Sequence, residues 1–140
     1  MNTHSFVYVT TIRTTPAQLW RALIEPEFTL QYWNRRIESA WHVGAPVTHH
    51  LGDGTVETGT VLAWDPPRRL AYTFEHDDAD LKDTQVTMTL APAGDNVKLT
   101  VVHDRLSDTA HRAVGAGWPG VLSSLKTVLE TGRALGWATS

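Results

Sequence analysis

The sequence predicts an α+β fold of the helix-grip type, in which a curved seven-stranded antiparallel sheet wraps around one long C-terminal helix. Three observations carry this prediction. Short segments rich in β-branched and aromatic residues recur along the chain and are joined by hairpin-length turns. Two short helical segments follow the first of these strands. A longer amphipathic helix comes after the last strand.

The first strand and the two short helices occupy the N-terminal quarter of the chain. The strand is predicted over residues 5–13, SFVYVTTIR. Thr15 before Pro16 is typical of a helix start, because it offers a capping hydroxyl and a proline at the first helical position. Pro26 ends that helix, and a second one is predicted over residues 27–33.

Six further strands are predicted between residues 37 and 106. Their segments are 37–43, 46–51, 55–64, 68–76, 84–92 and 97–106. Short connections make neighbouring strands antiparallel, and the period of two assigns side chains to faces. The face predicted to point inward carries Trp41, Leu70, Tyr72, Phe74, Val86, Met88, Leu90, Val97, Leu99, Val101 and His103. The opposite face carries mainly threonines and charged residues, so one side of the sheet is apolar and the other is wet.

The C-terminal helix is predicted from the segment GWPGVLSSLKTVLETG, residues 117–132. Its apolar stripe consists of Trp118, Val121, Leu122, Leu125, Val128 and Leu129. Gly115, Gly117 and Pro119 predict a break or kink near the start, and Gly132 is a candidate C-cap. From Pro119 to Glu130 such a helix is about 18 Å long. Because two short helices hold one end apart, we expect a space between this helix and the sheet.

Composition places the chain among ordinary soluble globular proteins and predicts one domain over residues 1–140, with 41% hydrophobic and 19% charged residues. A net charge of −3 without a basic cluster argues against nucleic acid as a partner. Apolar runs are too short to span a membrane, and the N-terminus lacks a secretory signal pattern. With no cysteine in the chain, these features favour a cytoplasmic protein.

Four segments carry a resemblance to a known family. They are TTPAQLWRALIEPEFTLQYW (14–33), GDGTVETGTVLAWDPPRRLAYTFE (52–75), LTVVHDRL (99–106) and GWPGVLSSLKTVLETG (117–132). In this order and at these distances, they resemble the START-like (SRPBCC) superfamily, and more narrowly the family named after the activator of heat shock protein 90 ATPase. The resemblance implies the helix-grip fold. It leaves function open, since the superfamily includes lipid carriers, hormone receptors, polyketide cyclases and a co-chaperone domain.

Three functions follow as hypotheses. The first is the binding of an apolar or amphipathic small molecule between the sheet and the C-terminal helix, by a monomer or a homodimer. The second is interaction with a chaperone, for which the pairs Arg35-Arg36 and Arg68-Arg69 are candidate contacts. The third is a cyclase-like activity, for which His103 and Tyr72 are the candidate acid and base.

The candidate ligand-binding residues come from the predicted inward face and from the helix stripe. They are Trp41, His49, Tyr72, Phe74, Met88, Leu99, His103, Trp118, Leu122 and Leu125. Apolar pockets are lined by core-type side chains, with a few polar groups that orient the ligand. The alternative is that the same residues only fill a core. His49, Tyr72 and His103 would supply the polar groups, or would be satisfied core or rim residues.

The sequence indicates no metal site and no cofactor. Its histidines lack the spacing of zinc ligands, and His49 and His50 point to opposite faces of one strand. The acidic segment 75–83 lacks the glycine and closing glutamate of a calcium loop and is predicted to be a solvated hairpin. No nucleophile elbow or glycine-rich phosphate loop is present.

Overall fold

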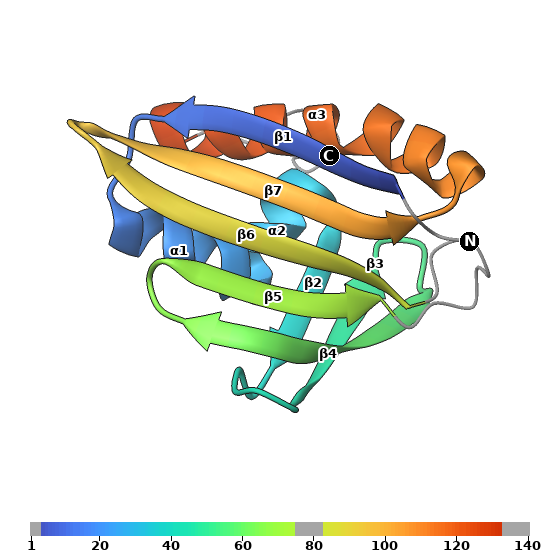
Figure 1. Cartoon of the computed structure of the whole chain (residues 1–140). Coiled ribbons are helices and arrows are strands. Elements are labelled where there is room, and N and C mark those ends of the chain that lie inside the picture. Colours follow the sequence, from blue (N-terminus) through green and yellow to red (C-terminus); the bar gives the residue numbers. More distant parts are fainter. Residues whose placement is uncertain (1–3, 75–82, 133–140) are drawn as a thin grey trace.

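The seven predicted strands form one antiparallel sheet in a computed structural model that describes residues 4–74 and 83–132 (Figure 1). The strands are β1 (His4–Ile12), β2 (Arg35–Ser39), β3 (Pro46–Leu51), β4 (Val56–Asp65), β5 (Arg69–Phe74), β6 (Thr84–Ala93) and β7 (Asn96–Leu106). Their order across the sheet is β1-β7-β6-β5-β4-β3-β2. The helices are α1 (Pro16–Ile24), α2 (Pro26–Trp33) and α3 (Asp108–Thr131). This arrangement confirms the predicted helix-grip fold.

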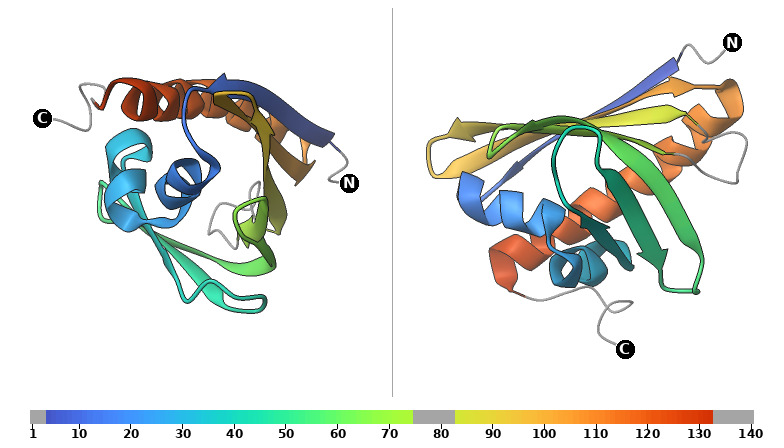
Figure 2. Two further views of the ribbon diagram at one scale, coloured as in Figure 1. Left: turned by 90° about the vertical axis from the view of Figure 1, so that its left-hand side faces the viewer. Right: turned by 90° about the horizontal axis from the view of Figure 1, so that it is seen from below.

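The sheet curls so that all three helices lie on its concave side (Figure 2). β4 makes the curl possible because it changes partner along its length. Its first half pairs with β3, and from Val61 onward it pairs with β5, with an irregular register between Val61 and Ala63. Gly59 lies just before the change. A Cβ there would come within 1.7 Å of the Thr73 carbonyl oxygen, and the next amide, of Thr60, donates to the Thr73 hydroxyl at 3.0 Å.

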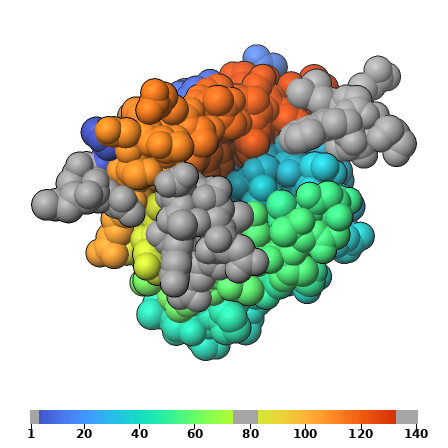
Figure 3. All heavy atoms as spheres, turned by 90° about the vertical axis from the view of Figure 1, so that its right-hand side faces the viewer, coloured from blue at the N-terminus to red at the C-terminus, as the bar shows by residue number. Residues whose placement is uncertain are grey.

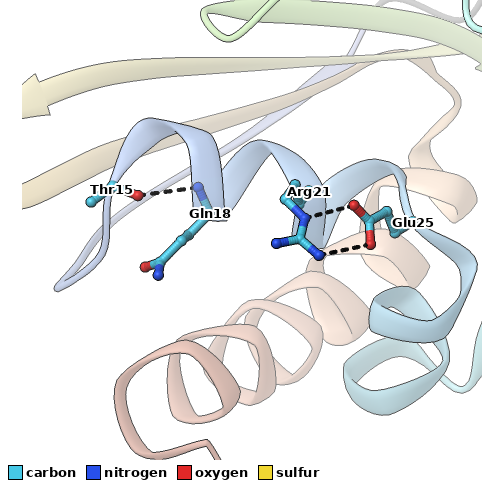
Figure 4. A network of polar contacts seen from close by, with 4 residues as sticks. All are labelled: Thr15, Gln18, Arg21 and Glu25. Carbon is cyan, nitrogen blue, oxygen red and sulfur yellow. Dashed lines mark hydrogen bonds and ion pairs between the residues drawn. The ribbon is translucent and has the colours of Figure 1, made fainter.

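The predicted start of α1 is confirmed by its cap (Figure 4). The Thr15 hydroxyl accepts the amide proton of Gln18 at 3.2 Å, and Pro16 occupies the first turn. At the other end Arg21 donates to Glu25, with Nε to Oε2 at 2.7 Å, four residues along the helix.

α3 is longer than expected. A break or kink near Pro119 was predicted. The helix does not break there and runs from Asp108 to Thr131, which at 24 residues is about 36 Å. Ser107 caps its start by accepting the Ala110 amide proton at 3.1 Å, and Gly132 ends it in the left-handed conformation at φ 74°. Pro119 removes one backbone donor without ending the helix, because the surrounding packing outweighs one missing bond.

The core lies between the concave face of the sheet and the three helices. Its fully buried members include Leu19 of α1, Tyr32 of α2, Leu99 of β7, and Leu122 and Leu125 of α3. In the part of the chain that the structure describes, no helix is long and apolar enough to cross a membrane. The acidic hairpin predicted over residues 75–83 falls almost entirely outside the described residues.

Replacing Gly59 by alanine should lower the free energy of unfolding by about 2 kcal/mol or more, because the new methyl group meets a backbone oxygen of β5. Urea denaturation measures the change. The matched control is Gly120→Ala, where an added Cβ meets nothing within 4 Å. The control should stabilise α3 by about 0.5–1 kcal/mol. Equal midpoints for Gly59→Ala and the unchanged protein would contradict the role given to this glycine.

Candidate functional site

Five ring-bearing side chains meet on the inner side of α3, and we call them the aromatic cluster: Trp33, His49, Tyr72, His103 and Trp118. Trp118 lies with its ring centroid 5.1 Å from Trp33 and 6.1 Å from His103. The His49 ring is 5.9 Å from Trp33 and 5.6 Å from Tyr72. The cluster thus joins α2, β3, β5, β7 and α3 through edge-to-face and tilted contacts, which favour aromatic pairs.

His103 orients the Trp118 ring. The indole Nε1 of Trp118 can only donate, and it lies 3.1 Å from Nδ1 of His103, so Nδ1 is the acceptor. The neutral ring then carries its proton on Nε2, which donates to the Thr84 hydroxyl oxygen at 2.9 Å. Burial lowers the pKa of His103 to about 4. With both ring nitrogens engaged, this histidine is a positioning group for Trp118.

Tyr72 is also held in its neutral form. Its side chain is buried between the sheet and the helices, and burial raises the pKa of its phenol above the ordinary value. At neutral pH the phenol is therefore not ionised, and its hydroxyl can take part in hydrogen bonds as a neutral group.

Arg35, at the start of β2, adds a charge to the edge of the cluster. Its guanidinium stacks over the Trp33 ring with Cζ 4.6 Å from the centroid. Nη1 donates to Oε1 of Glu57 and to Nδ1 of His49, each at 3.2 Å. Nε is buried and has no hydrogen-bond partner in the described part of the chain. The side chain is 17% exposed and that of Glu57 is 8% exposed, so this ion pair is largely desolvated.

A cleft of about 460 Å³ opens beside this ion pair. Three parts of the fold form its walls: the passage from α2 into β2, the turn after β3, and the middle of α3. The lining residues are Trp33, Asn34 and Arg35 from the first, Leu51, Gly52 and Asp53 from the second, and Gly117, Gly120 and Val121 from the third. Figure 3 shows this end of the molecule, with α3 across the top and α2 and β3 beneath it.

The cleft owes its width to glycines in α3. A Cβ added at Gly117 or at Gly120 would meet no atom within 4 Å, so this helix face presents bare backbone to open space. Trp33 and Arg35 belong both to the cleft wall and to the contacts of the aromatic cluster. The cleft therefore borders the aromatic cluster at these two side chains.

The structure buries most of the residues predicted to bind a ligand. They are His49, Tyr72, Met88, Leu99, His103, Trp118, Leu122 and Leu125. It brings His49, Tyr72, His103 and Trp118 into one cluster. Met88, Leu99, Leu122 and Leu125 pack in the core around it.

The other two predicted residues, Trp41 and Phe74, are not among these buried side chains. Trp41 was placed on the inner face of a strand, but β2 ends at Ser39 and Trp41 has φ 54° in the following turn. There it stacks on Trp64, with centroids 5.4 Å apart, away from the aromatic cluster. The side chain of Phe74 lies outside the described part of the structure.

Sequence reasoning missed Trp33 and Glu57, and it treated Arg35 as a surface charge. Instead Arg35 is largely buried against Trp33 and Glu57. Asn34 could have indicated where α2 ends and β2 begins, because asparagine after an apolar helical segment is typical of a left-handed C-cap. Asn34 has φ 54° and turns the chain from α2 into β2. Within the described ranges, no group of three or more acidic, histidine or cysteine side chains is arranged to hold a metal ion.

Acidification should weaken the fold through His103. Its pKa lies below that of an unfolded histidine, so the unfolded state takes up a proton first, and stability is full above about pH 6.5 and falls as the pH drops toward 4. Between about pH 7.5 and pH 5 this group should cost about 2 kcal/mol of unfolding free energy. The non-titrating variant His103→Gln should show a correspondingly smaller pH dependence in urea denaturation. An identical pH dependence in both proteins would contradict a buried neutral His103.

Solved structures of other proteins share this fold. Protein MLL2253 from Mesorhizobium loti is 27% identical, with a TM-score of 0.78 over 90% of this chain and 96% of its own. The Aha1 dimer from Colwellia psychrerythraea is 18% identical, with a TM-score of 0.79 over 94% of this chain and 99% of its own. CalU16 from Micromonospora echinospora is 21% identical, with a TM-score of 0.78 over 91% of this chain and 77% of its own.

No curated protein sequence matches the chain significantly. The sequence profile described as "Activator of Hsp90 ATPase homolog 1-like protein" matches residues 13–130, which include the aromatic cluster and every residue that lines the cleft. Together with the helix-grip architecture, this match shows that the chain belongs to the activator of Hsp90 ATPase homolog 1-like family of START-like proteins.

Proposed function

We propose that this protein binds one amphipathic small molecule in the cleft between α3 and the turn after β3. The observation that carries the proposal is the cleft itself, which opens along the glycine face of α3 and borders the aromatic cluster at Trp33. Its volume of about 460 Å³ falls in the range of clefts that hold a single small ligand.

The chemistry of the walls supports an amphipathic ligand. Trp33, Leu51 and Val121 supply apolar surface, and each 100 Å² of apolar area removed from water contributes about 2.5 kcal/mol before the costs of binding. Arg35 and Asn34 supply polar groups at one end of the same cleft. A few polar groups in an apolar wall fix the orientation of a ligand.

Binding is favoured over catalysis by the state of the two candidate acid–base groups. A general acid or base must reach a substrate proton, but both nitrogens of His103 already bond to Trp118 and Thr84. Tyr72 is neutral and buried. The cyclase-like alternative therefore needs a different proton donor or acceptor.

Filling the cleft tests the binding proposal. Gly120→Leu places a side chain in open space on α3, so the helix should remain folded while the affinity for the neutral fluorescent probe N-phenyl-1-naphthylamine falls by about tenfold, or about 1.4 kcal/mol. Fluorescence titration measures the affinity, and thermal unfolding checks the fold.

The matched control is Ala116→Leu, an exposed position on the same helix that does not line the cleft. It should leave the probe affinity unchanged. If both variants bind the probe as well as the unchanged protein does, the cleft is not the binding site.

The family description favours a second candidate, stimulation of ATP turnover by heat shock protein 90. In this case a surface rather than the cleft is the sensitive region. Arg36 and Arg68 have side chains 47% and 72% exposed and are suitable for charge reversal. Mixing with the purified chaperone should raise its ATP turnover, Arg36→Glu with Arg68→Glu should reduce this rise, and Gly120→Leu should not. Unchanged turnover on mixing would remove this candidate.

A further inference from the structure

We infer that the cleft selects an anionic ligand, a small amphiphile whose oxyanion group pairs with the guanidinium of Arg35 while its apolar part lies along Gly117, Gly120 and Val121. This inference rests on the proposed function and names the ligand class for the same cleft. It follows from how Arg35 is held, from the charges around it and from the shape of the opposite wall.

Only one nitrogen of the Arg35 guanidinium makes hydrogen bonds to the described residues. Both of its hydrogen bonds, to Glu57 and to His49, leave from Nη1. In the described part of the chain Nε has no acceptor, although its burial denies it water. Buried donors are rarely left without a partner, because the loss of hydration is not compensated. Nη2 likewise has no acceptor among the described residues, and because Nε is enclosed, Nη2 is the guanidinium nitrogen that a ligand in the cleft can reach.

Nη2 carries two N–H donors, and a hydrogen bond from a guanidinium to an oxyanion is stronger than one between neutral groups. Stacking over Trp33 at 4.6 Å holds the guanidinium plane in place, so little ordering is needed when a ligand binds. Arg35 lines the cleft, so an oxyanion that enters there meets this side chain.

Among the described residues two carboxylates lie near Arg35, and neither is hydrogen-bonded to Nη2. Glu57 contacts Nη1 from the inner side. Asp53 is a second, negatively charged carboxylate on the cleft wall. It accepts the Thr55 amide proton at 2.9 Å within the turn after β3 and makes no hydrogen bond to Arg35 in the described structure. The opposite wall, formed by Gly117, Gly120 and Val121, carries no charged side chain and suits the apolar part of the ligand.

The experiment compares two fluorescent probes that differ in one group. 8-Anilinonaphthalene-1-sulfonate carries a sulfonate on the ring system that N-phenyl-1-naphthylamine presents without charge. The unchanged protein should bind the sulfonate probe about tenfold more tightly than the neutral one, because one charge-assisted contact is added. Gly120→Leu should weaken both probes.

Three variants separate the charge of Arg35 from its structural role. Glu57→Gln keeps Arg35 and removes the competing carboxylate, so the affinity for the sulfonate probe should rise. Arg35→Met in the Glu57→Gln background avoids leaving a buried unpaired glutamate, and it should lower the affinity for the sulfonate probe about tenfold more than it lowers the affinity for the neutral probe. Arg36→Met, next to Arg35 but 47% exposed and paired with Glu27, is the matched control and should change neither affinity.

Near-UV circular dichroism checks packing in each variant, and the neutral probe serves as an internal measure of cleft integrity. Should the double variant lose its fold, Arg35→Lys keeps the charge without the planar fork, and it should also reduce the preference for the sulfonate probe.

The possible failures are distinguishable. If neither probe responds to Gly120→Leu, the proposed function itself fails. If both probes respond to Gly120→Leu, but the preference for the sulfonate is absent or survives Arg35→Met, the cleft stands and the anionic ligand class is wrong. Sedimentation of the protein with phosphatidylglycerol vesicles, lost in the Arg35→Met double variant, would assign the oxyanion to a membrane headgroup and overturn the inference of a free ligand.

Discussion

The contact of Trp118 with the sheet and with α2 holds the inner face of this molecule together. α3 must place a large ring between strands and helices that come from distant parts of the chain. His103 accepts the indole proton at 3.1 Å, and Trp33 packs against the ring at 5.1 Å. The indole therefore has a satisfied donor in a buried place, which an apolar contact alone would not provide. The position of α3 over the sheet, and with it the width of the cleft, depends on this contact.

Periodicity predicted the parts of the fold that depend on local pattern. Strand alternation placed Tyr72, Met88 and Leu99 on the inner face, since the period of two leaves no freedom once the strands are paired. It wrongly placed Trp41 in a strand, because β2 ends at Ser39 and Trp41 itself has a positive φ, although the side chain still packs against the core. It also underestimated the length of α3, because tertiary packing continues the helix through Pro119. The site was harder to predict, because Arg35, His49 and Glu57 come from three strands and their contacts depend on the curl of the sheet.

The Arg35–Glu57 pair is informative because such pairs are costly to bury. Removing two charges from water is repaid only when the geometry is good and the remaining donors find partners. Here one guanidinium nitrogen serves both Glu57 and His49, while Nε is left without an acceptor in the described structure. A hydrophobic pair of similar volume would stabilise the fold at least as well. The anionic ligand proposed above would give this buried charge a role that fold stability does not.

The conformational cost of the glycines in α3 is a second argument that the cleft has a role. A glycine inside a helix costs about 0.5–1 kcal/mol relative to alanine, and α3 contains Gly117 and Gly120 one turn apart on the cleft wall. Close packing does not require them, since a Cβ at either position would meet open space. At Gly59, by contrast, the backbone of β5 excludes any side chain. One glycine thus serves the curl of the sheet, and two leave open the space beside Arg35 at the expense of helix stability, which supports the proposed binding of a small molecule there.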